Sequence, residues 1–482
     1  MDRSPVRAVP LLVLGSLVAS MVWIGSASAQ AAPRAAAPVT FTQSWNQRVT
    51  GSPIATSSPV VVSNGRKPFV VTGDVGGNLR AFDLTSGAPV SGWSRVNAGY
   101  EIQAPLSSDG ANVYVPVAQD GPFNVPQFKK YDAKGRLLWS TNPRIRYPAR
   151  GVGFLLAGMS LVNSGGWKAI GPSSGQSVYG FNGANGTKQW SFLNADSTMA
   201  TAAIADVRGA GTPQVITSND LSEPTSGRRT VGFLRVLTLA GRQLCSARQM
   251  ASGTRYAAEG YNNSSPAVME VRGKPLIVLG STGPRQYGDG DNQLLGYNAD
   301  CTLRWKSSPF AGRVQAAPAL ADVLGTGTPQ IVQMVGIPAG ANQMYPRVYV
   351  LDPATGKTLA DTRSNLWWHA AQVIYPPGTS VVTADVDGDG AQDMFVPANK
   401  LLVISGRTRK VLTEIAIPGA IQNTPIITEL PGKGLRVTVA GYSGAGGWIS
   451  SFTSSSGRFG KNAWTRFANS SRLTGVQGTV NG

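Results

Sequence analysis

Apolar and turn-forming residues alternate along the chain in a way that divides most of it into short hairpins. One kind of hairpin places two apolar runs around a glycine-containing turn, as in 58–73 (SPVVVSNGRKPFVVTG) and 265–280 (SPAVMEVRGKPLIVLG). A second kind often ends in tryptophan, as in 128–139 (FKKYDAKGRLLW) and 177–190 (SVYGFNGANGTKQW). Runs of Val, Ile, Leu and aromatic residues between Gly-containing turns are typical of antiparallel strands. The pattern predicts an all-β protein.

The two kinds of hairpin follow one another and together form a four-stranded unit that repeats. Eight units start near residues 58, 104, 152, 201, 265, 317, 380 and 424. Four-stranded units that recur regularly are typical of the blades of a β-propeller, in which each blade covers the face of its neighbour. We therefore expect a β-propeller of eight blades. The unit at 152–190 has the weakest apolar pattern, so a ring of seven blades is the alternative.

Tryptophans mark the ends of several units. Six of them recur at the fourth-strand position, where we expect packing between blades: Trp45, Trp93, Trp139, Trp190, Trp305 and Trp464. Trp45 belongs to a unit whose beginning is missing, so it is expected to lie on the outer strand of the last blade and join the two chain ends. Trp464 competes for that place. We expect one propeller domain over 42–475, with a C-terminal tail over 476–482.

The N-terminal segment has the features of a secretory signal peptide. Arg3 and Arg7 precede an apolar run over 9–24, and an Ala-Ser-Ala cleavage pattern follows at 27–29. This order of charged, apolar and small residues predicts a signal peptide over 1–29. The alternative is a single membrane anchor. We expect a secreted mature protein without a membrane span, which begins with a flexible lead-in over 30–41.

The charge of the chain favours anionic partners. Lys and Arg number 43 against 25 Asp and Glu, which gives a formal net charge of +18. A large positive surplus attracts anionic polymers. The basic residues are scattered singly, however, and no basic run or basic helix indicates nucleic-acid binding. We expect an anionic glycan, a cell-envelope polymer or a protein as partner, no nucleic acid, and a monomer.

One stretch, 383–396 (TADVDGDGAQDMFV), concentrates acidic residues in this basic chain. Asp385, Asp387 and Asp389 occupy positions 1, 3 and 5 of a calcium loop, the carbonyl of Ala391 stands at position 7, and Asp393 at position 9. Calcium binds six to eight oxygen ligands, and alternate residues of a tight turn direct carboxylates at one centre. The spacing predicts a structural Ca²⁺ site. A solvated acidic turn is the alternative.

Two related loops lack most of these carboxylates. After their first Asp they carry other residues at the equivalent positions, namely Asp206 with Arg208, Ala210 and Gln214, and Asp322 with Leu324, Thr326 and Gln330. These sister loops keep the turn glycines. The turn is therefore expected to fold without a cation, and the extra acids of the 385–393 loop are not needed for the fold itself.

The repeats resemble two known families of propeller repeat. The hairpins at 206–216 (DVRGAGTPQVI), 322–332 (DVLGTGTPQIV) and 385–396 (DVDGDGAQDMFV) resemble FG-GAP (VCBS-type) repeats, found in integrin-type propellers and in secreted bacterial proteins. Segments such as 79–87 (LRAFDLTSG) and 348–357 (VYVLDPATGK) resemble the PQQ-like repeats of quinoprotein-type propellers. The resemblance implies a propeller whose FG-GAP calcium loop is closed by Asp393.

The chain has two cysteines, Cys245 and Cys301. Cys245 ends the fourth strand of one unit, and Cys301 lies in the turn of the next unit, where sister units have Gly135, Gly241 or Gly356. In an exported protein this placement predicts a disulfide between neighbouring blades. Two separate thiols are the alternative. Quinoprotein dehydrogenases carry adjacent cysteines against their cofactor, and these two are not adjacent, so no PQQ is expected.

Residues for common catalytic chemistries are few. The single histidine, His369, would have to serve any Ser-His-Asp triad, and no G-x-S-x-G motif is found. We predict no catalytic residues. A ligand site is expected in the insertion loops at 281–292, 336–346 and 360–378. In the last of these, an aromatic group suited to stacking on sugar rings consists of Trp367, Trp368, His369 and Tyr375. The alternative is packing of these aromatic side chains on the scaffold.

These observations lead to three hypotheses about function. We expect a secreted, calcium-binding β-propeller that acts as a non-catalytic binding or scaffold protein for an extracellular glycan or protein. The alternatives are a polysaccharide lyase-like enzyme acting on an acidic polysaccharide, since lyases can use Lys, Arg or Tyr, and an envelope assembly factor. A propeller hosts many activities, so whether the protein is an enzyme stays open at this point.

Overall fold

The computed structural model describes residues 39–49, 51–63, 67–118, 126–143, 155–194, 198–219, 233–248, 264–282, 292–340, 343–362, 379–430, 432 and 434–477. The chain divides into two units, Met1–Ala35 and Ala36–Gly482, and all described residues belong to the second. The predicted signal peptide (1–29), most of the lead-in, and the aromatic group of Trp367, Trp368, His369 and Tyr375 lie outside the described residues.

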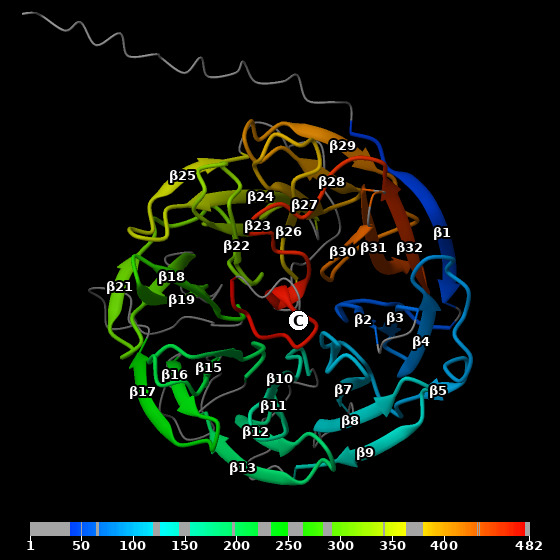
Figure 1. Ribbon diagram of the computed structural model, residues 1–482, viewed down its shortest axis with the longest axis horizontal. Coiled ribbons are helices and arrows are strands. Elements are labelled where there is room, and N and C mark those ends of the chain that lie inside the picture. Colours follow the sequence, from blue (N-terminus) through cyan, green and yellow to red (C-terminus); the bar gives the residue numbers. More distant parts are fainter. Residues whose placement is uncertain are drawn as a thin grey trace, which may run out of the picture. The chain divides into compact units, whose positions relative to one another are not determined.

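The second unit is an eight-bladed β-propeller (Figure 1). Each blade is a four-stranded antiparallel sheet, and its strands are ordered from the centre of the ring to the rim. The first blade consists of β2 (Val60–Val62), β3 (Phe69–Gly73), β4 (Asn78–Asp83) and β5 (Val96–Asn97). The second consists of β6 (Ser107–Ser108), β7 (Asn112–Ala118), β8 (Pro126–Asp132) and β9 (Leu137–Thr141). The third consists of β10 (Ser160–Asn163), β11 (Trp167–Ser173), β12 (Ser177–Asn182) and β13 (Lys188–Leu193). The fourth consists of β14 (Ala203–Ala205), β15 (Gln214–Ser218), β16 (Phe233–Thr238) and β17 (Gln243–Arg248).

The remaining blades complete the ring. The fifth consists of β18 (Ala267–Val271), β19 (Lys274–Ser281), β20 (Gln293–Tyr297) and β21 (Leu303–Lys306). The sixth consists of β22 (Ala319–Ala321), β23 (Gln330–Gly340), β24 (Gln343–Leu351) and β25 (Thr358–Asp361). The seventh consists of β26 (Val382–Ala384), β27 (Asp393–Pro397), β28 (Leu401–Ile404) and β29 (Val411–Ile415). The eighth consists of β30 (Ile426–Leu430), β31 (Gly434–Ser443), β32 (Gly446–Ser454) and β1 (Thr42–Val49).

The predicted fold class is confirmed, and the ring has eight blades rather than seven. The unit at 152–190, whose apolar pattern was the weakest, forms a complete blade from β10 to β13. The inner strands are short and apolar, as in β22 and β26, whose residues are all buried. Such strands are covered on both faces by neighbouring blades, which explains their continuous apolar runs.

The two ends of the chain meet in the eighth blade. The N-terminal strand β1 pairs antiparallel with β32, and Trp45 lies opposite Ser451. The expectation that Trp45 lies on the outer strand of the last blade is therefore confirmed. This pairing closes the ring with backbone hydrogen bonds between segments roughly 400 residues apart, and it removes an open sheet edge.

Tryptophans on or beside the outer strand join five of the blades to the next blade. The indole N–H of Trp139 donates to the carbonyl of Gly183 at 3.2 Å, and a Cβ at Gly186 would lie 2.6 Å from the Trp139 ring. The same contact recurs from Trp45 to Leu84, from Trp93 to Ala133, from Trp190 to Leu239 and from Trp305 to Pro353. Packing between blades is thus the role of these side chains, as expected.

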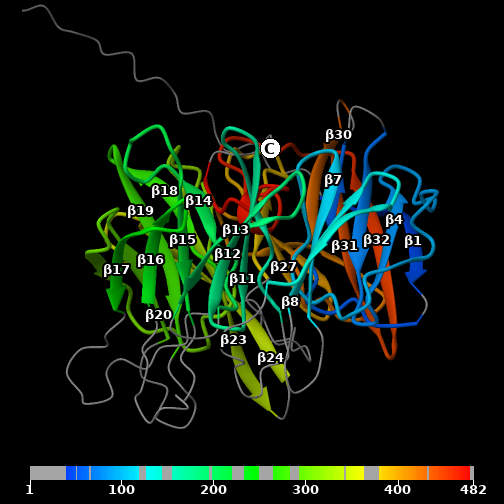
Figure 2. The same ribbon diagram turned by 90° about the horizontal axis from the view of Figure 1, so that it is seen from below.

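The chain after β32 crosses the centre of the ring, and we call residues 455–477 the strap (Figures 1 and 2). Its carbonyls accept hydrogen bonds of 2.7–2.8 Å from the inner-strand amides of Ser108, Leu161, Ile204, Val268, Thr383 and Ile427. These amides lie on the inner edges of the blades, which would otherwise be unpaired. The strap continues through Gln477, whose N–H donates to the carbonyl of Val268 at 3.0 Å.

Trp464 lies in the strap and not on a fourth strand, so that expectation was wrong. Its backbone exchanges hydrogen bonds with Thr383 of β26, and its side chain is 1% exposed in the core. A tryptophan after a polar turn fits both placements, so local spacing does not separate them. The strap also contains the short 3₁₀ helix η2 (Phe467–Asn469). No helix among the described residues is long and apolar enough to cross a membrane.

Candidate metal centre

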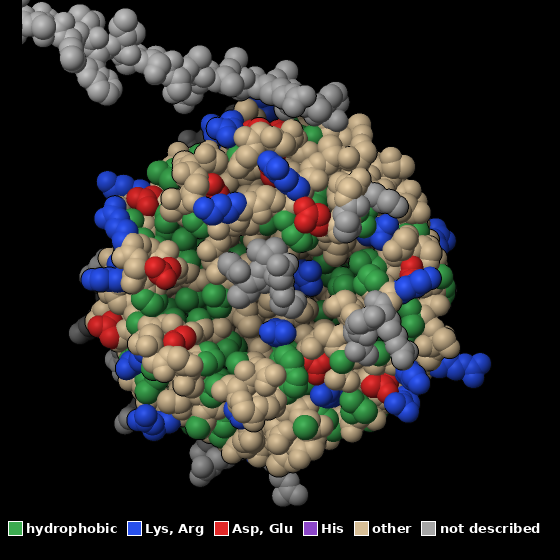
Figure 3. Space-filling model, viewed as in Figure 1, with side chains coloured by type: hydrophobic (Ala, Val, Ile, Leu, Met, Phe, Trp, Pro, Cys, Tyr) green, Lys and Arg blue, Asp and Glu red, His purple; other side chains and the backbone are tan. Residues whose placement is uncertain are grey.

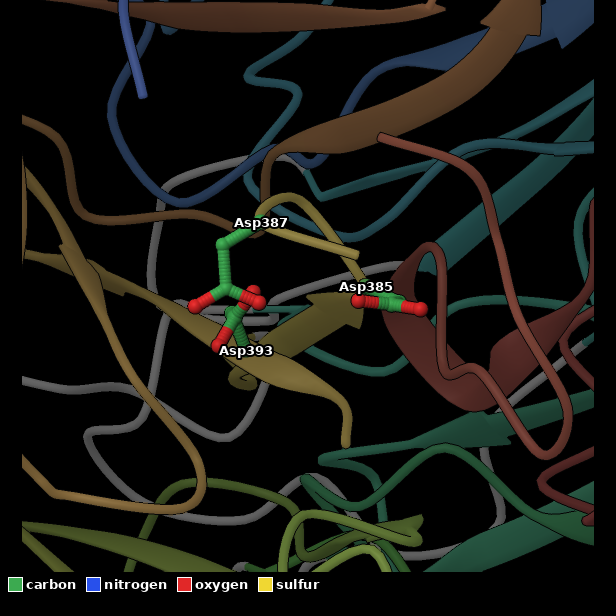
Figure 4. A group of neighbouring side chains, drawn as sticks. All are labelled: Asp385, Asp387 and Asp393. Atoms are coloured by element: carbon green, nitrogen blue, oxygen red, sulfur yellow. The ribbon is translucent and has the colours of Figure 1, made fainter. Parts of the chain in front are cut away.

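The predicted calcium loop connects β26 to β27 in the seventh blade. Gly388 and Gly390 have φ angles of +77° and +88°, a conformation that favours glycine and lets the loop turn sharply. The turn brings together Asp385, Asp387 and Asp393, whose carboxylates each offer an oxygen, and these oxygens all lie within 4.8 Å of one another (Figure 4). The side chain of Asp387 points toward Asp393 across the turn (Figure 4).

Asp385 carries an acceptor that has no partner. Its side chain is 1% exposed, and no described residue donates a hydrogen bond to its Oδ1. The other oxygen, Oδ2, lies 3.4 Å from Nε of Arg458. A buried carboxylate oxygen without a donor is costly, because it has lost water and gained nothing in return. A bound cation would satisfy this oxygen.

Asp387 and Asp393 lie so close together that keeping both carboxylates charged costs free energy. Asp393 accepts hydrogen bonds from the amides of Val386 at 2.9 Å and Gly406 at 3.2 Å. Burial, followed by the charge of Asp387, nevertheless raises the pKa of Asp393 to about 8. Burial also raises the pKa of Asp387, with the charges of Asp389 and Asp385 adding to it. A divalent cation would oppose each of these effects.

Asp389 does not join the group. Its Oδ2 pairs with Nε of Arg407 at 3.0 Å, and its Oδ1 accepts the amide of Ala391 at 2.8 Å. The structure therefore brings together three of the four predicted acids and directs the fourth toward an arginine. The assignment of Asp389 and of the Ala391 carbonyl as ligands stays a prediction.

The three grouped acids fit calcium. They are hard oxygen donors, and calcium accepts carboxylates in one- or two-oxygen coordination together with carbonyls and water. Zinc prefers nitrogen and sulfur, which the group does not offer. The chemistry of the donor set thus agrees with the predicted metal, and the orphaned oxygen of Asp385 indicates where charge is missing.

The structure joins Cys245 to Cys301 in a disulfide with a Cα–Cα distance of 5.9 Å. Cys245 lies opposite Val236, at the register position where Trp190 lies opposite Gly180 in the preceding blade. Its Sγ lies 3.5 Å from the carbonyl of Ala299. Cys301 has a φ of +67°, the conformation of the glycines at this position in sister blades. The disulfide therefore replaces a tryptophan–glycine contact between two blades.

One feature missed from the sequence is a long hairpin in the sixth blade. The segment 336–346 was expected to form a loop, but its described residues, 336–340 and 343–346, belong to a hairpin made by β23 and β24, in which Ile337 lies opposite Tyr345 and Pro338 opposite Met344. The flanking strands are shorter, since β22 pairs only as far as Val332 and β25 only with residues 349–351. We call residues 335–347 the arm. The only signal for it in the sequence was the unusual length of the segment that forms β23 and β24.

The faces of the ring differ. The strap lies on one face, and the arm projects from the opposite one (Figure 2). On the strap face, Lys and Arg side chains are spread around the ring and interspersed with Asp and Glu (Figure 3). That distribution agrees with the single, scattered basic residues of the sequence and forms no concentrated patch on this face.

Comparisons with known proteins support the propeller and its repeats. The sequence model of the family described as "Outer membrane protein assembly factor BamB" matches residues 75–277, which supports PQQ-like repeats in that part of the chain. No curated protein matches the chain. The solved structure of BamB from Moraxella catarrhalis is similar, with 13% sequence identity, a TM-score of 0.54, and coverage of 86% of this chain and 100% of that chain. Sqt1 from Saccharomyces cerevisiae has 12% identity, a TM-score of 0.55, and coverage of 87% and 99%. At these identities the two structures show the fold alone.

Proposed function

We propose that this protein is a non-catalytic scaffold that binds a protein partner through the arm face and holds one structural calcium ion at Asp385, Asp387 and Asp393. The arm is the observation that carries the proposal. In the sixth blade β23 and β24 continue past their flanking strands, as far as the pair of Gly340 and Gln343. A two-stranded extension of this kind presents side chains and strand edges beyond the ring.

The arm carries apolar residues. Ile337 packs against the core of the ring, whereas Pro338 is exposed and Met344 is half-buried. Exposed apolar side chains on a projecting hairpin are typical of protein-binding surfaces. The backbone bridge between Arg313 and Gly336 braces the base of the arm. A braced, projecting arm is suited to a preformed contact.

The partial match to the BamB family supports the same class of function. That family is described as an outer membrane protein assembly factor. For the present chain we carry over only this class: a propeller that binds protein. Export through the predicted signal peptide, and a positive charge that attracts anionic partners, belong to the same proposal.

Site-specific photo-crosslinking in the native host tests the proposal. A photoreactive residue at Met344 of the arm is expected to crosslink to a partner protein, whereas one at Thr328, exposed in a sister loop of the sixth blade, is not. Replacement of residues 337–345 by Asn-Gly shortens the arm to an ordinary hairpin turn. This variant is expected to keep the melting temperature and to lose the partner in co-purification.

Three results would contradict the proposal. The first is equal crosslinking, or none, at both positions. The second is binding on a glycan array that survives removal of the arm, which would favour glycan recognition elsewhere on the ring. The third is release of unsaturated products from acidic polysaccharides, which would make the protein a lyase.

A further inference from the structure

The strap begins against the candidate metal centre. The amide of Asp385 donates to the carbonyl of Arg458 at 3.0 Å, and the amide of Arg458 donates to the carbonyl of Asp385 at 2.9 Å. The hydroxyl of Ser456 donates to the carbonyl of Val386 at 3.2 Å. The residue with the orphaned carboxylate oxygen is therefore also the residue that holds the start of the strap.

The contact is too close for side chains on the strap. Gly457 and Gly460 have φ angles of +91° and +67°. A Cβ at Gly457 would lie 2.9 Å from Cα of Val386, and one at Gly460 would overlap the side chain of Gln392. The side-chain Nε2 of Gln392 donates to the carbonyl of Phe459 at 2.7 Å. The strap backbone thus rests directly on the acidic loop, so movement of the loop displaces the strap.

From this anchor the strap reaches the inner edges of the ring. The amide of Trp464 donates to Oγ1 of Thr383 at 2.9 Å, and the amide of Thr383 donates to the carbonyl of Trp464 at 2.7 Å. Thr383 lies on β26, two residues before Asp385. Further along, the amides of Ile204 and Val268 donate to the strap at 2.8 Å each. The metal centre, β26 and the strap form one connected network.

We propose that the cation at Asp385, Asp387 and Asp393 fastens the strap to the inner strands of the ring, so that its loss releases the strap from these strands. This inference rests on the calcium site of the proposed function. With the cation bound, Asp385 is fixed and its backbone holds Arg458. Without it, the buried Oδ1 of Asp385 has no partner among the described residues, and the loop relaxes. Asp385 then no longer presents its amide and carbonyl to the strap.

Hydrogen exchange of the full chain tests the inference. Amide exchange is measured in calcium and in EDTA at Thr383, Ile427, Ile204 and Val268, whose amides bond to the strap. EDTA is expected to lower protection at these amides at least tenfold. Amides between β15 and β16, such as that of Val215, which lies opposite Leu237, serve as the internal reference and are expected to change less than twofold.

Three variants locate the effect. Asp387→Asn removes one acid of the group without touching the strap and is expected to reproduce the EDTA result in the presence of calcium. Asp322→Asn makes the same change in a sister loop that lacks the other acids, and it is expected to leave protection of the strap-bonded amides unchanged in calcium. Arg458→Gln removes the ion pair but keeps the backbone bridge, so calcium is expected still to fasten the strap.

Calorimetric titration with calcium alone separates the two levels of the proposal. If calcium binds and the strap-bonded amides keep their protection in EDTA, the strap inference is overturned while the metal site stands. If EDTA lowers protection equally at the reference amides, the cation stabilises the whole ring and the specific link to the strap is wrong. If no calcium binds, the metal site of the proposed function fails and this inference fails with it.

Discussion

The acidic loop of the seventh blade and the sister loops of the fourth and sixth blades share one type of turn. They differ in which groups accept hydrogen bonds from the backbone amides of that turn. In the fourth blade, Asp206 accepts the amides of Ala210 at 3.1 Å and Gly211 at 2.7 Å. Burial opposes ionisation there, but these amides lower the pKa of Asp206. The first acid of this sister loop is thus a cap for the turn and needs no ion.

The sixth blade repeats the arrangement. Asp322 accepts the amide of Thr326 at 2.9 Å and that of Gly327 at 2.6 Å. At the ninth position a neutral side chain completes the turn, because Oε1 of Gln330 accepts the amide of Leu324 at 3.0 Å. The expectation that the turn folds without a cation agrees with this internal satisfaction of its backbone amides.

In the seventh blade acids other than the first accept the amides of the turn. The amide of Asp389 donates to Oδ1 of Asp387 at 3.1 Å, and the amide of Ala391 donates to Asp389 at 2.8 Å. Asp385 is left without these caps. Asp393 replaces the neutral glutamine and accepts the amide of Val386 at 2.9 Å, but as a buried acid. The comparison shows that each extra acid shifts the loop from internal satisfaction toward dependence on an added charge.

The largest expected difference between the loops appears in the pH dependence of stability without calcium. The pKa of Asp393 rises from 3.8 to about 8 in the folded state. Between these values the folded protein binds a proton that the unfolded chain has released, so stability falls as pH rises, by at most about 1.4 kcal/mol per pH unit. Thermal unfolding in EDTA from pH 4 to 8 measures the slope. Asp393→Asn is expected to flatten it, and an unchanged slope would contradict the assignment.

Chelation of calcium at constant pH is expected to have the next largest effect. An ion at a concentration of 100 times its Kd stabilises the folded state by about 2.7 kcal/mol, which corresponds to several degrees in Tm. Calorimetry in calcium and in EDTA at pH 7 measures this shift. The same Tm in both would show that the acidic loop, like its sister loops, is stable without a bound ion.

Converting the acidic loop into a sister loop is expected to remove the dependence of stability on calcium. Asp387→Arg, Asp389→Ala and Asp393→Gln together reproduce the residues of the Asp206 loop at positions 3, 5 and 9. Because the variant restores a neutral ninth residue and removes repulsion, we expect it to be more stable than the parent in EDTA by about 2 kcal/mol. It should not respond to calcium in thermal unfolding. A calcium response that persists would place the ion elsewhere.

The smallest expected effect concerns a sister loop. Asp322→Ala removes the acceptor of two backbone amides and is expected to cost about 1 kcal/mol, as for the loss of a capping side chain. The loss should be the same in calcium and in EDTA when measured by denaturant unfolding. A calcium-dependent loss would mean that this loop also binds the ion.

The eight blades were predictable from the sequence because each hairpin is local. Its strands and turn lie within about 20 residues of one another, so the apolar periodicity and the glycines report them directly. The disulfide and the position of Trp45 followed from the repeat, since both were inferred from gaps or substitutions in an otherwise regular pattern.

The metal centre was predictable only in part. The spacing of Asp385, Asp387 and Asp393 reports three side chains on one turn, and the structure groups them. Spacing did not reveal that Asp389 pairs with Arg407, which lies 18 residues further along the chain. Nor did it reveal Arg458, which reaches the same loop from the strap across 73 residues. Ion pairs of this kind depend on which segments the fold brings together.

By itself the sequence determined the architecture: a ring of four-stranded antiparallel blades, the contacts of five of the six predicted tryptophans between blades, and one loop richer in acids than its sisters. It left seven blades as an alternative to eight, and the structure has eight. Only the tertiary structure decided the course of the strap, the place of Trp464, the extension of the arm and the counter-ions of the acidic loop. The physical reason is how far apart in the sequence the contacting residues lie. Hairpins are stabilised by neighbours in sequence and leave a periodic pattern, whereas the strap is held by backbone hydrogen bonds to strands from most of the ring. Backbone groups are the same in every residue, so such contacts leave no pattern in the side chains.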